Sequence, residues 1–160
     1  MISFYFNTFS NFEKRYNGLL RRNDKIFEIL FDSIDIKSVL RNWNRYCIAK
    51  HNKKFSSAAL NAYNIIYSLK DFHIVQYLYK NKVVAEGVVF ISPETKTLYY
   101  CIFHWDEAVF KYSPGIYNYV KTIDFCYKHN YNFSFCYGFQ EYKLNIIKDF
   151  VTINKNETWT

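Results

Sequence analysis

The chain has 160 residues and a mass of 19.4 kDa; half of its residues are hydrophobic and 22% are aromatic. This length suits one domain with its own core, and a composition this apolar excludes a disordered chain. The net charge of +7 favours an anionic partner, such as a phosphate-rich cofactor, RNA or a membrane surface, without choosing among them. We therefore expect a single domain over residues 1–160.

The first part of the chain predicts three helices and one short strand. An S-x-x-E capping box opens a predicted helix over residues 10–22. Residues 25–31 alternate enough for a short strand, and residues 34–50 place apolar side chains at helical spacing. Ser56 or Ser57 can cap a further helix that runs to about residue 69.

The middle of the chain predicts a meander of three antiparallel strands. Residues 73–80 and 83–91 have strand-like patterns and are separated by Asn81 and Lys82. Because Asn tolerates positive φ, this pair is a plausible two-residue hairpin turn. A turn at "SPETK" then leads into a third strand, "TLYYCIFHW", at residues 97–105.

The last part predicts a helix at 115–128, a strand at 132–138 and a short helix at 140–150. On the first of these helices we expect one apolar side, with Asn118, Lys121 and Lys128 elsewhere; that side consists of Ile116, Tyr119, Val120, Ile123 and Tyr127. A helix between strands 97–105 and 132–138 is a crossover, which lets them run parallel in an otherwise antiparallel sheet. The predicted fold is α/β: a twisted, mostly antiparallel mixed sheet, flanked by helices and splayed between two parallel strands.

The junction "KYSPGIYNYV" at residues 111–120 carries one of only two prolines and one of only four glycines in the chain. Pro114 presets the backbone for helix entry, and Gly115 has no Cβ to obstruct a ligand. The first amides of a helix lack intrahelical partners and attract anions, and Lys111 and Ser113 add donors. The junction either starts a helix and does no more, or it holds a phosphate.

The order of these segments resembles the GNAT superfamily of N-acyltransferases, and more closely its branch that includes the Fem-type aminoacyl transferases. The family pattern is approximately Y-S-P-G, a helix of about a dozen residues, a short strand ending in D-F-G, and a Y-K pair; in this chain Cys136 or Tyr137 stands where the Asp is usual. Here it is "YSPG" at 112–115, a helix, "SFCYG" at 134–138 and "YK" at 142–143, within a match over roughly residues 55–148. The resemblance implies a GNAT-like fold and acyl transfer from acyl-CoA to an amine.

For the donor, the resemblance implies that CoA phosphates lie at the helix start. The residues expected to bind them are Lys111, Ser113, Gly115, Ile116, Tyr117 and Lys143. For catalysis, a general base should lie on a strand beside the splay. Glu86, a carboxylate inside an apolar strand, and His104, at the end of a strand, are the candidates. Tyr142 is the expected acid for the leaving thiolate, since the family places a tyrosine on its last helix.

The acceptor amine is expected to be a small molecule, a peptide or a protein side chain, and a homodimer is possible. Two alternatives stay open. A Fem-type donor, aminoacyl-tRNA, would also account for the positive charge. A non-catalytic binding or regulatory protein on the same fold would account for Tyr117, where the wider superfamily has a small residue.

The remaining expectations concern metal and location. The four cysteines lack metal-ligand spacing, so we expect no metal. No signal-peptide pattern and no run of 18 apolar residues is seen, so we expect a cytoplasmic protein without a membrane span.

Overall fold

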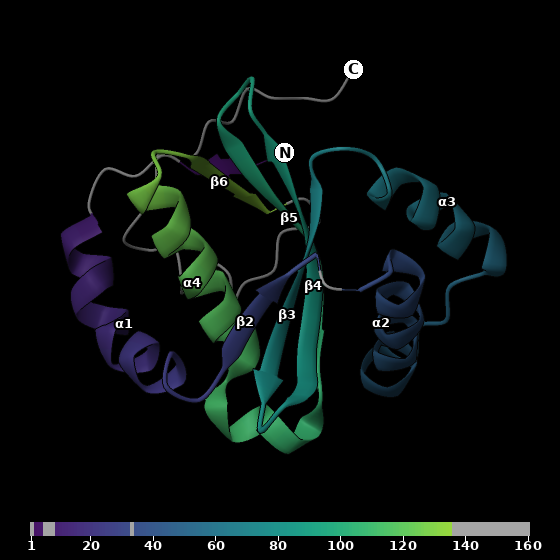
Figure 1. The fold of residues 1–160 in the computed structure, drawn as a ribbon, viewed down its shortest axis with the longest axis horizontal. Coiled ribbons are helices and arrows are strands. Elements are labelled where there is room, and N and C mark those ends of the chain that lie inside the picture. Colours follow the sequence, from purple (N-terminus) through teal and green to yellow (C-terminus); the bar gives the residue numbers. More distant parts are fainter. Residues whose placement is uncertain (1, 5–8, 33, 136–160) are drawn as a thin grey trace.

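The computed structural model describes residues 2–4, 9–32 and 34–135, whose strands form one six-stranded sheet in the order β1-β6-β5-β4-β3-β2 (Figure 1). All neighbouring strands run antiparallel except β5 and β6, which are parallel. The predicted mixed sheet is therefore confirmed. The strands are β1 (Ile2–Phe4), β2 (Glu28–Phe31), β3 (Phe72–Tyr79), β4 (Lys82–Ser92), β5 (Thr97–Trp105) and β6 (Asn132–Phe135).

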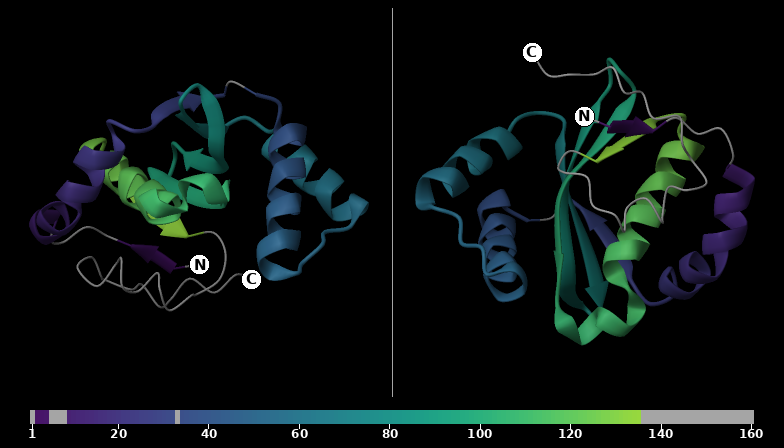
Figure 2. Two further views of the ribbon diagram at one scale, coloured as in Figure 1. Left: turned by 90° about the horizontal axis from the view of Figure 1, so that it is seen from below. Right: turned by 180° about the vertical axis from the view of Figure 1, so that it is seen from behind.

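Two pairs of helices cover the sheet. Figures 1 and 2 show α1 and α4 on one face and α2 and α3 on the other. A short 3-10 helix, η1, links β5 to α4. The helical elements are α1 (Phe9–Asn23), α2 (Ile36–His51), α3 (Ser57–Tyr67), η1 (Glu107–Tyr112) and α4 (Pro114–Lys128). Among the described residues, no helix is long and apolar enough to cross a membrane.

The predicted helices are confirmed, with small changes at their ends. Ser56 caps α3, since its hydroxyl accepts a hydrogen bond from the Ala59 amide at 3.1 Å. The strand β2 begins three residues later than expected, and β1 was not predicted at all. The last predicted helix, at 140–150, and the end of strand 132–138 lie outside the described residues.

The hairpin between β3 and β4 turns one residue earlier than predicted. Its two loop residues are Lys80 and Asn81, with φ of 52° and 61°, and Tyr79 pairs with Lys82. Positive φ at both central residues is typical of a type I′ turn, whose twist matches that of the strands. The sequence favoured Asn81 as the first loop residue because asparagine tolerates positive φ, but the pairing register makes Asn81 the second loop residue and Lys80 the first.

The described core has three clusters of buried side chains, two of which contain residues of α4. Beneath α2 and α3, Val39 and Leu40 pack against Val88 and Ile102. Beneath α4, one cluster consists of Val89, Leu98, Tyr100, Tyr119, Val120, Ile123, Cys126 and Phe133.

The expected inner face of α4 was partly wrong. Ile116 and Tyr127 are 42% and 46% exposed, whereas Asn118 is buried. Asn118 fits there because its side chain accepts a hydrogen bond from the Tyr77 hydroxyl and donates one to the Tyr100 hydroxyl.

The strand β5 pairs with β4 on one side and, in parallel, with β6 on the other. The described pairing of β5 with β6 runs from Thr97–Asn132 to Tyr100–Phe135, while β5 continues to Trp105 alongside β4. The register with β4 shifts at this point, because Cys101 has no partner residue between Ile102 and Tyr100. A bulge of this kind bends a strand and increases its twist. The predicted parallel pair is thus confirmed, and the second half of β5 extends beyond the described part of β6.

Candidate functional site

A cavity of about 440 Å³ lies between α2 and the strands β3 to β5. Its lining combines charged, aromatic and small apolar side chains. The lining residues are Ile34, Asn42, Arg45, Tyr46, Ala49, Lys50, Gln76, Val83, Val84, Ala85, Glu86, His104, Trp105, Asp106 and Glu107. This volume is within the range of small-molecule sites.

Three polar side chains cross the floor of the cavity in a row, one from each strand. Gln76 on β3 is in register with Glu86 on β4, which is in register with His104 on β5. Residues directly opposite each other in a sheet point to the same face, so the row faces α2. From that helix, Asn42 Nδ2 donates to Glu86 Oε1 at 2.7 Å, and Gln76 Nε2 donates to Oε2 at 2.9 Å.

Glu86 is 2% exposed and is nevertheless held as a carboxylate. Burial alone would raise its pKa, but the adjacent His104 imidazole and the hydrogen bonds from Asn42 and Gln76 outweigh burial and bring the pKa below its ordinary value of 4.5. The site therefore holds a fixed negative charge at neutral pH.

His104 lies between this carboxylate and the open part of the cavity. Its Nε2 atom is 3.3 Å from Glu86 Oε1, close enough for an ion pair but without the alignment of a good hydrogen bond. His104 lines the cavity, and Nδ1 is the ring nitrogen that does not contact Glu86. The Tyr46 ring stands beside the imidazole, at 6.1 Å between centroids.

The mouth of the cavity carries charges of both signs. Lys50 Nζ is paired with Glu107 Oε1 at 2.6 Å. Asp106 caps η1, because its Oδ1 accepts from the Ala108 amide at 2.9 Å. Arg45, an exposed residue of α2, completes the set of charged residues there.

Trp105 is a wall shared by the cavity and the start of α4. On one side its ring packs 5.0 Å from that of Tyr46. On the other side it lies against Gly115, where an added Cβ would be 3.2 Å from the nearest indole carbon. The absence of a side chain at Gly115 therefore accommodates the indole, and the notion that it leaves space for a ligand is not supported on this side.

The start of α4 has the geometry expected of a helix N-terminus with free amides. Pro114 is the first helical residue, after Ser113 in the left-handed region with φ of 52°. The Tyr117 amide makes the first backbone bond of the helix, to Ser113 O at 2.9 Å. The amides of Gly115 and Ile116 therefore precede the helical ladder.

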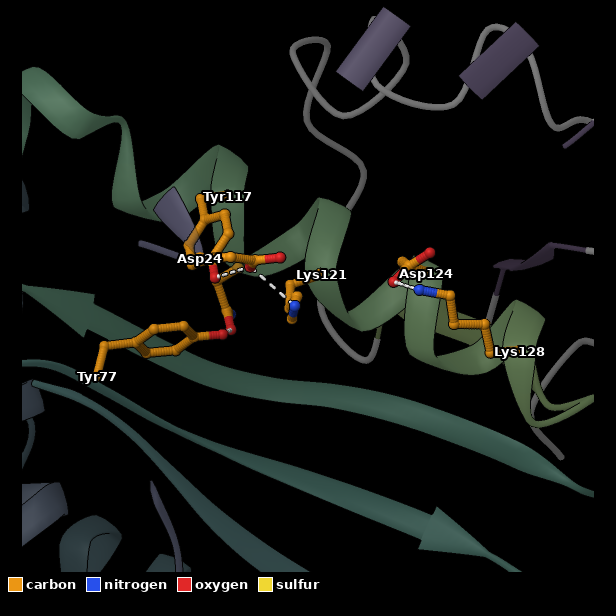
Figure 3. A network of polar contacts seen from close by, with 7 residues as sticks. Asp24, Tyr77, Tyr117, Lys121, Asp124 and Lys128 are labelled. Carbon is orange, nitrogen blue, oxygen red and sulfur yellow. Dashed lines mark hydrogen bonds and ion pairs between the residues drawn. The ribbon is translucent and has the colours of Figure 1, made fainter. Parts of the chain in front are cut away.

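Lys111 and Tyr117 were also expected to bind phosphate at this helix start, and they lie in different environments. Lys111 is exposed, with its ammonium over the Tyr112 ring. Tyr117 is fully buried, and its hydroxyl donates to Asp24 Oδ1 at 2.6 Å. Lys121 Nζ reaches the same oxygen at 2.8 Å, so Asp24 ties α4 to the end of α1 (Figure 3). With its amide and its hydroxyl both engaged, Tyr117 has no group left for a phosphate.

The structure thus brings two of the predicted catalytic residues, Glu86 and His104, into one site. Tyr142 and Lys143 lie outside the described residues. Sequence reasoning missed Asn42 and Gln76, which hold the carboxylate. The signal for Gln76 was present, since it is a polar residue inside the apolar strand "HIVQYLYK".

Comparisons with known proteins identify the fold. No protein-family model and no curated protein matches the sequence. Among solved structures, the chain is similar to an aminoglycoside acetyltransferase from an uncultured soil metagenomic sample, crystallised with sisomicin, at 16% identity and a TM-score of 0.53. That match covers 78% of this chain and 87% of the other.

The chain is also similar to a possible acetyltransferase from Clostridium difficile 630, at 18% identity and a TM-score of 0.51, over 75% of this chain and 84% of that one. At these identities the likeness establishes only that the chain shares the fold of these two proteins. The neighbours lend no support to the Fem-type branch.

Proposed function

We propose that this protein is an N-acyltransferase that moves an acyl group from acyl-CoA to a small amine held in the cavity. The observation that carries the proposal is the buried pair of Glu86 and His104 on the cavity floor. An ionised carboxylate behind an imidazole that faces an open cavity is an arrangement suited to removing a proton. The pair lies on β4 and β5, and His104 is in the half of β5 that follows its described pairing with β6.

The reaction requires a base because an alkylamine is protonated at neutral pH, with a pKa near 10 in an unperturbed lysine. In the proposal, His104 Nδ1 accepts a proton from the acceptor ammonium. Glu86 acts through His104, since its negative charge orients the ring and stabilises the imidazolium. Asn42 and Gln76 hold the carboxylate in place and keep it ionised.

The freed amine then attacks the carbonyl carbon of the thioester. A C–N bond forms, the C–S bond breaks, and CoA leaves as a thiolate that takes up a proton. The products are an N-acyl amide and free CoA, so protons and electrons balance without another reactant.

The start of α4 is the proposed binding site for the CoA phosphates. The amides of Gly115 and Ile116 lie outside the helical ladder, and the N-terminal end of the helix dipole attracts an anion. Lys111 adds a cation nearby, and Arg22 lies within reach, since its guanidinium donates to the Tyr112 carbonyl at 3.4 Å. These groups fit a pyrophosphate. Trp105 lies between this helix start and the cavity, so the thioester end of the donor would have to extend past its ring to reach the acceptor.

A small molecule is the favoured acceptor because the cavity volume of about 440 Å³ suits one. A structural neighbour was crystallised with the aminoglycoside sisomicin, which is consistent with this size class.

Turnover and binding together test the proposal. Acetyl-CoA should raise the melting temperature by mass action, and mixing it with an acceptor panel should release free thiol. His104→Gln should lower turnover by about 100-fold or more and leave acetyl-CoA binding intact. His73→Gln is the matched control, since that strand histidine pairs with Asp32 at the surface and does not line the cavity.

Three results would contradict the proposal. Full turnover in His104→Gln would remove the assigned base. Binding of charged tRNA without binding of any acyl-CoA would favour the aminoacyl-tRNA donor. Binding of neither would favour a non-catalytic protein on this fold.

A further inference from the structure

The wall that α2 contributes to the cavity carries a guanidinium without an ion-pair partner among the described residues. Asn42, Arg45, Tyr46 and Ala49 line the cavity at spacings that place them on one face of the helix. The helix contains no aspartate or glutamate, so it offers Arg45 no acidic neighbour. The other lining cation, Lys50, is already paired with Glu107.

The acidic groups of the cavity are engaged elsewhere. Both oxygens of Glu86 accept hydrogen bonds, from Asn42 and Gln76, and His104 lies against one of them. Asp106 caps η1. Arg45 is therefore the cation of this lining that remains available to an anionic group of a bound molecule.

We infer that the acceptor carries a carboxylate as well as its amine, as in a free amino acid; this inference rests on the proposed function. A base on the sheet wall and a guanidinium on the helix wall complement a small zwitterion. The planar fork of arginine matches a carboxylate, which can accept two parallel hydrogen bonds from it. An acceptor with several cationic groups and no anion would instead bring like charge to Arg45.

The two walls are close enough for a small molecule to span. Arg45 follows Asn42 by three residues, which is a rise of about 4.5 Å along the helix axis. Asn42 itself touches Glu86, at 2.7 Å. The Arg45 side chain thus leaves the helix less than one turn from Asn42, which contacts the carboxylate on the cavity floor.

Binding measured without any acyl donor tests the inference independently of turnover. We would titrate matched pairs of an amino acid and its decarboxylated amine, namely leucine with 3-methylbutylamine and phenylalanine with 2-phenylethylamine. Loss of a charge-assisted hydrogen bond costs about 1.5–3 kcal/mol, so each amino acid should bind about tenfold or more tightly than its amine.

Two arginine variants of the same helix complete the design. Arg45→Gln should abolish the preference for the amino acid. Arg41→Gln should retain it, because Arg41 is exposed on α2 but does not line the cavity. Equal melting temperatures for the two variants would show that both fold.

The outcomes separate this inference from the proposed function. The inference is overturned if the amines bind as tightly as the amino acids, if neither member of any pair binds, or if Arg45→Gln keeps the preference. If the preference exists and depends on Arg45 but no acyl transfer occurs, the inference stands and the proposed function fails. If amines without a carboxylate are acylated as well as amino acids, the proposed function stands and the inference fails.

Discussion

Replacing Glu86 by glutamine should destabilise the protein and change how its stability depends on pH. The carboxylate is 2% exposed, accepts from Asn42 at 2.7 Å and from Gln76 at 2.9 Å, and lies 3.3 Å from His104 Nε2. Glutamine keeps one acceptor oxygen but presents an amide donor to at least one of these donors. At about 1.5–3 kcal/mol for a hydrogen bond to a charged group, we expect a loss of about 2–3 kcal/mol.

The pH dependence has a definite sign. The pKa of Glu86 is lower in the folded protein than its ordinary value of 4.5. A carboxyl group of this kind stabilises the folded state above that ordinary value, and the contribution is lost as pH falls through the lower, folded pKa. The difference in unfolding free energy between wild type and Glu86→Gln should therefore be complete at neutral pH and shrink below about pH 4.5.

Urea unfolding at a series of pH values measures both effects. Glu107→Gln is the control, because Glu107 lines the same cavity but its side chain is 79% exposed in a pair with Lys50. A surface pair of this kind contributes less than about 1 kcal/mol. The reasoning is refuted if the two variants are equally stable at neutral pH, or if the cost of Glu86→Gln is the same at every pH.

Three further variants test the packing and capping that position the site. Gly87→Ala should cost about 1–3 kcal/mol in urea unfolding, because its Cβ would lie 2.5 Å from a backbone oxygen of β5; Gly18→Ala, with no atom nearby, should not destabilise. Asp24→Ala should cost about 1–3 kcal/mol by stranding the Tyr117 hydroxyl, and combining it with Tyr117→Phe should cost less than the sum of the two single changes. Additive costs would contradict that contact. Ser56→Ala should lower stability by about 1 kcal/mol, and no change would show that the cap contributes nothing.

Local signals predicted most of the elements that frame the site. A serine cap at Ser56 and a proline at residue 114 mark real helix starts. The crossover helix between two strand patterns correctly predicted the parallel pair. These features succeed because they depend on a few neighbouring residues, such as a cap or a turn.

The wrong or missing predictions concern side chains whose burial or hydrogen bonds depend on residues far away in the sequence. Helical periodicity predicted that Ile116 faces inward, but Ile116 is exposed and Asn118 is buried. The Asn118 amide lies between two tyrosine hydroxyls from the sheet. Asn42 looked like an ordinary polar residue of a helix, and only the packing of α2 over the sheet shows that it holds Glu86. Tyr117 was expected to contact a phosphate, but its hydroxyl donates a hydrogen bond to Asp24, which is far away in the sequence. A single sequence does not reveal such partners.

The most direct test of the account is the product itself. Wild-type protein would be incubated with acetyl-CoA labelled with carbon-13 in the acetyl group and with a panel of amines and amino acids, and the products analysed by mass spectrometry. The account predicts a labelled N-acetyl product whose rate of formation falls about 100-fold or more in His104→Gln but is unchanged in His73→Gln. A protein that binds acetyl-CoA and acceptor yet forms no labelled amide, or forms it equally fast without His104, would contradict the central claim.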